Sequence, residues 1–113
     1  MEYKTIETER RNYQIIATVI EKRIYLGITD IFREEILSLV NQGISELIIN
    51  LENVAVMNSA GLGVLIMARD IMHKKDGAVK LTNLQPLMQD IFSRMRLDTL
   101  FSIFPNIDNA LEN

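Results

Sequence analysis

The chain has 113 residues, 48% of them hydrophobic and 24% charged, which fits one folded domain with a hydrophobic core and excludes intrinsic disorder. A net charge of −3 argues against direct binding to nucleic acid, and the absence of cysteine excludes disulfides, thiol catalysis and thiolate metal sites. No apolar run approaches the roughly 18 residues of a membrane span, and the N-terminus lacks the pattern of a signal peptide. We therefore expect one domain over residues 1–113, cytoplasmic and without membrane insertion.

Strand patterns open the chain. Residues 13–20 (YQIIATVI) are rich in β-branched side chains and predict a strand, which residues 23–26 pair with or extend. Before it, residues 2–7 (EYKTIE) alternate weakly between polar and apolar side chains and predict an edge strand.

A helix and a buried strand follow. Apolar residues recur at helical spacing over residues 32–40, with Thr29 or Asp30 as the expected N-cap and Gly43 as the end of the helix. Residues 47–51 (LIINL) are short, apolar and branched, which is typical of a strand buried on both faces.

A second helix is predicted from Ser59 to Lys75, because the following Asp76-Gly77 is a turn signal. Residues 79–84 (VKLTNL) alternate between apolar and polar side chains and predict another strand. This order of elements extends the alternation of strands and helices.

The last part of the chain predicts two helices around a short strand. Pro86 suits the first turn of a third helix, residues 100–104 predict the strand, and Asn106 is expected to cap a final helix ending near Leu111. The inward-facing side chains of the third helix are expected to be Leu87, Met88, Ile91 and Met95. The whole pattern predicts an α/β domain with crossover connections and at least partly parallel strands.

The junction between strand and second helix is the candidate site. Asn58 or Ser59 can cap this helix by accepting a hydrogen bond from a free amide, and Gly61 and Gly63 permit close packing or a tight entry into the helix. Residues 62–68 (LGVLIMA) have no polar face, so part of the helix is expected to be exposed as an apolar binding surface.

Catalytic side chains do not converge in this sequence. Ser59 and His73, the only histidine, lie on one helix at a separation of about 21 Å, given a rise of about 1.5 Å per residue. The local sequence NSAGLG is not a G-x-S-x-G nucleophile elbow, and the chain has no G-x-x-x-x-G-K-[ST] phosphate loop. We expect no enzyme activity, no cofactor and no metal site.

A hydroxyl at a helix N-terminus is well placed for a switch. Phosphorylation would add about −1.5 to −2 charges there, which the free amides and the helix dipole stabilise by about 0.3–1 kcal/mol. A partner on the same surface would have to desolvate this dianion, and each ~1.4 kcal/mol of such cost weakens binding about tenfold. Phosphorylation of Ser59 could thus release a partner without unfolding the domain.

Three segments of the chain carry a family signature. The first, residues 47–65 (LIINLENVAVMNSAGLGVL), has an apolar strand followed by an N-S-A-G-L-G helix start. The second, residues 76–86 (DGAVKLTNLQP), contains a turn, a strand and the entry to a helix. The third, residues 94–111, carries an L-D-x-L-F motif near the end of the chain. Together they resemble the STAS domain family, in particular the stand-alone bacterial anti-sigma factor antagonists. The resemblance covers most of the chain.

The resemblance implies a mixed sheet of four to five strands with about four helices packed on it. It also implies a protein that binds an anti-sigma factor, commonly also a serine kinase, until the kinase phosphorylates Ser59; a phosphatase reverses this step. Sigma-factor-dependent transcription is regulated in this way, and the nucleotide belongs to the kinase. The partner-binding residues implied are Tyr25, Asn58, Ser59, Ala60, Gly61, Leu62 and Gly63.

The chain departs from the family pattern at three places. Asn58 stands where the family usually has Asp, and Ala60 replaces a common Ser or Thr, which makes Ser59 the one hydroxyl at the junction. Residues 22–25 (KRIY) stand where antagonists typically carry an acidic G-E-L-D loop on the partner-facing surface. A basic, aromatic loop indicates a divergent kinase or another partner.

Two alternatives stay open at this point. The chain could be a STAS subunit with a structural or regulatory role in a larger assembly, such as a lipid-transport complex or a signalling scaffold, in which Ser59 is a helix cap without phospho-switching. An enzyme or a binder of small ligands is the other alternative, because one fold can host different sites.

Overall fold

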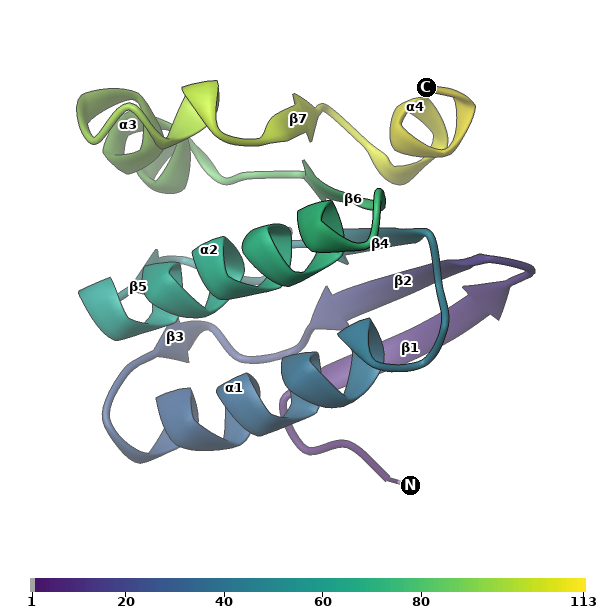
Figure 1. Ribbon diagram of the computed structural model, residues 1–113. Helices are drawn as coiled ribbons and strands as arrows, with labels where there is room; N and C mark the ends of the chain where they lie inside the picture. Colours follow the sequence, from purple (N-terminus) through teal and green to yellow (C-terminus); the bar gives the residue numbers. More distant parts are fainter. Residues whose placement is uncertain (1) are drawn as a thin grey trace.

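A five-stranded β-sheet organises the computed structural model, which describes residues 2–113 (Figure 1). The strand order is β1-β2-β4-β6-β7, in which β1 runs antiparallel to β2 and all other neighbours are parallel. The strands are β1 (Ile6–Arg11), β2 (Gln14–Val19), β4 (Glu46–Asn50), β6 (Ala78–Thr82) and β7 (Ser102–Phe104). This mixed sheet with its helices confirms the predicted α/β class.

A separate two-stranded parallel ribbon joins β3 (Arg23–Ile24) to β5 (Val56–Met57). Arg23 pairs with Val56 and Ile24 with Met57, so that the first pair is exposed and the second is buried. The ribbon brings the loop after β2 next to the segment that follows β4, although the two lie some thirty positions apart in the sequence.

Four α-helices and one 3-10 helix connect the strands within residues 2–113. They are α1 (Gly27–Val40), α2 (Ser59–Lys74), α3 (Pro86–Arg94), the 3-10 helix η1 (Leu97–Thr99) and α4 (Ile107–Glu112). α1 and α2 lie side by side across one face of the sheet, and both begin at the end of the molecule where β3 and β5 lie (Figure 1). The helix predicted from Ser59 is confirmed to within one residue at its C-terminal end.

The two faces of the sheet carry different layers. Leu47 and Ile49 on β4 belong to the main core under α1 and α2, whereas Ile48 joins Ile16 of β2 and Ala110 of α4 on the opposite face. Successive strand side chains point to opposite faces, so β4 is buried on both sides. This double burial explains why its sequence is almost unbroken in apolar residues.

Lys80 fixes α4 to the sheet. Its buried Nζ lies 3.0 Å from Glu46 Oε2 and donates a 2.7 Å hydrogen bond to the carbonyl of Ala110 in α4. The ammonium group also lies 5.6 Å from the centroid of the Phe104 ring. The charge is thus paired and hydrogen-bonded, as a buried ammonium requires.

The outer edges of the sheet are short or polar. After the buried Ile6, the other five residues of β1 are all exposed and four of them are charged, and β7 at the other edge has three residues. Short edge strands and charged edge side chains oppose pairing with a strand of another molecule.

Two N-terminal boundaries differ from expectation. The edge strand spans residues 6–11 instead of 2–7, because the amides of Lys4 and Thr5 bond to a side chain of α1. The helix α1 begins at Gly27 without a side-chain cap; its N-cap is Leu26, and the expected caps Thr29 and Asp30 lie inside its first turns.

The end of α1 and the final helix test two further expectations. α1 ends at Val40 with Asn41 as C-cap, so Gly43 lies in the following turn, where its φ of 70° is one that glycine adopts without strain. The expectation for α4 is confirmed, because the Asn106 side chain accepts a 2.8 Å hydrogen bond from the amide of Asn109.

The predicted inward face of α3 is right for Met88 and wrong for Leu87 and Met95. Met88 and Phe92 are buried, whereas Leu87 and Met95 are each 54% exposed. The stripes through Met88 and through Leu87 both repeat every four residues, so helical spacing alone cannot choose between them. Packing chooses the stripe through Met88, because the Phe92 ring lies 6.1 Å from the ring of Phe101.

The Glu35 carboxylate of α1 holds the N-terminal segment in place. It accepts hydrogen bonds from the amide of Lys4 (2.6 Å) and from the amide (2.8 Å) and hydroxyl (2.6 Å) of Thr5. Burial opposes ionisation of this carboxyl, but these three hydrogen bonds and the charge of Lys4 outweigh it. The pKa of Glu35 therefore lies below its ordinary value of 4.5.

We expect Glu35→Gln to lower the free energy of unfolding by about 1–3 kcal/mol at neutral pH, because bonds to a charged acceptor are replaced by weaker ones. The pKa of Glu35 is lower in the folded than in the unfolded chain, so its stabilisation is complete above 4.5 and is lost as pH falls through the folded pKa. Urea unfolding at about pH 7 and about pH 3 should show the difference from wild type shrinking in acid. Glu34→Gln on the exposed face is the control, and an equal loss at both pH values would contradict the expectation.

Candidate functional site

The turn from β5 into α2 exposes the hydroxyl of Ser59. Asn58, not Ser59, is the N-cap: its Oδ1 accepts a 2.8 Å hydrogen bond from the amide of Gly61, and its own amide donates to the carbonyl of Ile24 at 2.9 Å. Ser59 is exposed, and its hydroxyl has no hydrogen-bond partner among residues 2–113. The capping task is therefore done by its neighbour, which leaves this hydroxyl accessible.

The first turn of α2 approaches the β3–β5 ribbon too closely for a side chain at Gly61. A Cβ added at Gly61 would lie 2.4 Å from Met57 Cγ and 2.9 Å from Ile24 Cγ2. A Cβ at Gly63 would meet nothing within 4 Å. The two glycines therefore differ: Gly61 permits close packing, and Gly63 faces open space.

The apolar run of α2 is mostly buried, which corrects the expectation of an exposed apolar helix. Leu62 is 5% exposed, and Val64, Leu65 and Ala68 are also buried. Within residues 62–68, Gly63 is exposed, and Ile66 and Met67 are partly exposed. The reason is that α1 lies directly alongside α2, and the ribbon covers its first turn.

Exposed apolar surface instead comes from the loop before α1. Leu26 is 79% exposed, Tyr25 is 47% exposed, and Val56 of the adjoining strand is 36% exposed. Leu26 also has a φ of 44°, in the left-handed region that a leucine adopts at a cost in free energy. An exposed leucine held in an unfavourable conformation marks this loop as a candidate contact surface.

A hollow of about 630 Å³ lies beside this loop. We call it the loop hollow, and it is lined by Glu21, Lys22, Arg23, Tyr25, Leu26, Gly27, Ile28 and Ile31. Lys22 and Arg23 are exposed, and neither makes an ion pair with another residue in the described part of the chain. Because Asn58 bonds to Ile24, the loop hollow adjoins the exposed start of α2.

The residues expected to bind a partner divide into two groups. The exposed group consists of Tyr25, Ser59, Ala60 and Gly63, with Asn58 half-buried. The buried group consists of Gly61 and Leu62, which pack beneath the exposed residues. The sequence did not point to Leu26 or Val56. Alternation within the short strand that contains Met57 could have placed its neighbour Val56 outward. Alternation could not have found Leu26, because it places Leu26 on the same face as the buried Ile24.

Metal and membrane features do not add to this site. Within residues 2–113, no group of three or more His, Asp or Glu side chains is placed to hold a metal ion. None of the helices in that range combines the length and the apolar character needed to cross a membrane.

We expect opposite effects from adding a methyl group at the two glycines of α2. Gly61→Ala should lower the free energy of unfolding by about 1–3 kcal/mol, because the new Cβ overlaps the inner side-chain carbons of Met57 and Ile24. Gly63→Ala should raise it by about 0.5–1 kcal/mol, since alanine favours the helix and meets no atom. Urea unfolding measures both; equal stabilities would contradict a tight contact at Gly61.

Comparisons with known proteins agree with this architecture. An anti-sigma factor antagonist from Mycobacterium paratuberculosis matches with a TM-score of 0.85 at 22% identity, over 96% of this chain and 91% of that one. A putative anti-sigma factor antagonist from Thermotoga maritima matches with a TM-score of 0.84 at 17% identity, over 95% and 92% of the two chains.

A third similar structure is the phosphorylated form of SpoIIAA, a Bacillus cell fate determinant, with a TM-score of 0.72 at 17% identity over 95% of this chain and 96% of that one. At these identities the likeness shows a shared fold. The sequence model of the STAS domain matches residues 6–110, nearly the whole chain. The protein is therefore a member of the STAS domain family.

Proposed function

We propose that this protein is an anti-sigma factor antagonist whose binding is switched at Ser59. In the unmodified state it binds an anti-sigma factor that is also a serine kinase, which frees a sigma factor for transcription. The kinase supplies the nucleotide, phosphorylates Ser59 and thereby releases the protein, and a phosphatase restores it. The protein itself acts by binding and performs no catalysis.

The observation that carries this proposal is the free, exposed hydroxyl of Ser59 at the first residue of α2. A kinase needs an accessible acceptor, and this one takes no part in capping the helix, because Asn58 does so. Modification would therefore leave the cap intact. The similar structures named as anti-sigma factor antagonists support the same reading of the fold.

The start of α2 also suits a phosphoryl group. The Asn58 oxygen occupies the amide of Gly61, and the amides of Ser59 and Ala60 precede the first intrahelical bond, which runs from Leu62 to the carbonyl of Asn58. These amides and the positive end of the helix dipole stabilise added negative charge by about 0.3–1 kcal/mol. The domain should stay folded when Ser59 is phosphorylated, while the surface at this residue gains a negative charge.

The loop hollow and Val56 supply the contact area next to this switch. Exposed Tyr25 and Leu26 give apolar anchors, and Lys22 and Arg23 give two unpaired positive charges. A partner that fits this surface offers apolar pockets flanked by acidic side chains. We therefore expect the anti-sigma kinase to carry acidic side chains on the surface that contacts Lys22 and Arg23.

Ser59→Asp should weaken binding to a cognate anti-sigma kinase at least about tenfold, because a charge would have to be desolvated in the interface. Ser59→Ala should bind as wild type does and should not be released by ATP. Asn109→Asp in α4 adds the same charge at the opposite end of the molecule and is the matched control (Figure 1). Calorimetry with candidate anti-sigma kinases measures these affinities, and tight binding by Ser59→Asp would contradict the switch and favour a structural subunit.

Intact-mass measurement tests the modification itself. Incubation with ATP and the kinase should add one phosphoryl group, located at Ser59 by fragmentation and absent from Ser59→Ala. Phosphorylation at another residue, with Ser59 unmodified, would refute the assignment of the acceptor.

Arg23→Glu should slow association with the same kinase by about tenfold at low salt and reduce its dependence on ionic strength, because exposed charges steer encounter. Lys74→Glu makes the same charge reversal at the other end of α2 and should leave the rate nearly unchanged. Stopped-flow association at two salt concentrations measures the effect. Equal rates for the two variants would show that the basic loop lies outside the interface.

A further inference from the structure

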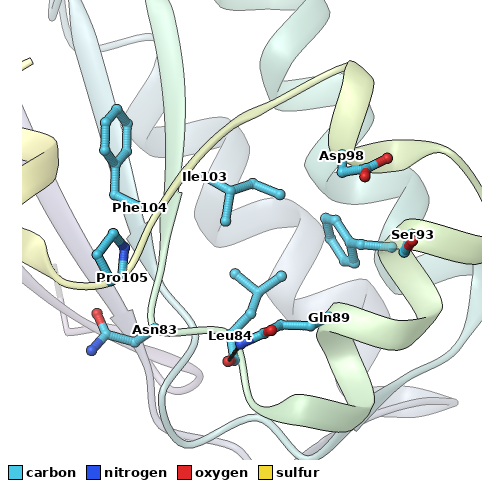
Figure 2. Close-up of a pocket in the computed structure, with 9 residues that line it drawn as sticks. Asn83, Leu84, Gln89, Ser93, Asp98, Ile103, Phe104 and Pro105 are labelled. Carbon is cyan, nitrogen blue, oxygen red and sulfur yellow. Dashed lines mark hydrogen bonds between the residues drawn. The ribbon is translucent and has the colours of Figure 1, made fainter.

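A second pocket, of about 520 Å³, opens where the last two parallel strands end. It lies between the carboxyl ends of β6 and β7, α3 and the 3-10 helix η1 (Figure 2). Its lining residues are Asn83, Leu84, Gln89, Phe92, Ser93, Asp98, Ile103, Phe104 and Pro105. None of these residues belongs to the loop hollow or to the start of α2.

The size of this pocket is that of a small-molecule site, and the pocket lies at the carboxyl ends of two neighbouring parallel strands. A volume of about 520 Å³ also falls within the range of about 300–1,000 Å³ that is usual for such sites. Ile103 and Leu84 project into the space between the strand end and the helices, and Ser93 and Asp98 flank it on one side (Figure 2).

Asp98 is the one charged side chain among the residues that line the pocket. Asp98 contributes a carboxylate that makes no ion pair within residues 2–113. One N–H of the Gln89 side-chain amide donates to the carbonyl of Leu84 at 2.9 Å, which leaves the amide oxygen as an acceptor and the second N–H as a donor. No Lys, Arg or His lines the pocket.

A buried acceptor without a partner lies in the wall on the Pro105 side. The Asn83 Oδ1 atom is buried and has no hydrogen-bond partner in the described part of the chain, and the residue has a φ of 60°. An unsatisfied buried acceptor destabilises a fold unless a donor reaches it. The pocket thus offers acceptors from Asn83, Gln89 and Asp98, beside donors from the same two side-chain amides and from the Ser93 hydroxyl.

We propose that this pocket binds a small molecule with an apolar body and a protonated amine or similar donor group. The apolar body would contact Leu84, Phe92 and Ile103, and the cationic head would lie near Asp98 and Gln89. Anions of the same size, such as carboxylates and phosphates, are disfavoured because every charged lining group is negative. This site is independent of the switch at Ser59.

Titration with 2-phenylethylamine, followed by amide chemical shifts of the ¹⁵N-labelled protein, tests the proposal. We expect saturable shifts confined to residues 83–105, with a Kd of about 1 mM for a probe of this size. The matched probe 3-phenylpropionate has a similar ring and chain with the opposite charge and should bind at least about fivefold more weakly. Absence of saturable shifts with the amine, or equal affinity for the two probes, would overturn the proposal.

Two variants locate the binding. Asp98→Asn should weaken amine binding about fivefold and reduce the preference for the amine, whereas Asp108→Asn in α4 makes the same change elsewhere and should not. Ser93→Trp, at an exposed position on α3, should fill the pocket and abolish the shifts while amide dispersion stays native. Unchanged amine affinity in Asp98→Asn overturns the assignment even if Ser93→Trp fails to fold.

Discussion

The contact of Gly61 with Met57 and Ile24 determines the geometry of the site. It seats the first turn of α2 directly on the β3–β5 ribbon, which in turn places the loop before α1 beside the helix start. Asn58 reinforces this arrangement, because it bonds both to the helix and to Ile24. With any side chain at position 61, the helix would have to lift, and the exposed hydroxyl of Ser59 would move away from the loop.

This arrangement separates two tasks, core packing and partner binding, that the sequence pattern predicted for one segment. The apolar residues of α2 hold the helix in the core, while affinity for a partner would come from Tyr25 and Leu26 on another element. Ser59 lies between the two, at the end of a helix whose stability does not depend on its hydroxyl. A charge added there would alter the surface without loosening the core.

Local signals in the sequence suffice where a single short-range contact decides the outcome. The bounds of α2 follow from a capping residue and a turn signal, and the α/β class with partly parallel strands follows from the alternation of strands and helices. Burial of residues 62–68 depends on the neighbouring α1, which local pattern cannot show. The inward face of α3 needed the contact of Phe92 with Phe101, and the positive φ of Leu26 has no local signature in a leucine.

The polar edges of the sheet have a consequence for how the molecule avoids aggregation. If Tyr25 and Leu26 bind a partner as proposed, their exposure also creates a risk of self-association. The charged side chains of β1 and the shortness of β7 oppose edge-to-edge pairing with a strand of another molecule. The exposed apolar side chains of the loop before α1 lie elsewhere, at one end of the molecule. In the proposed function, the recognition surface is therefore separate from the sheet edges, so substitutions in that one loop would change the partner without exposing a strand edge.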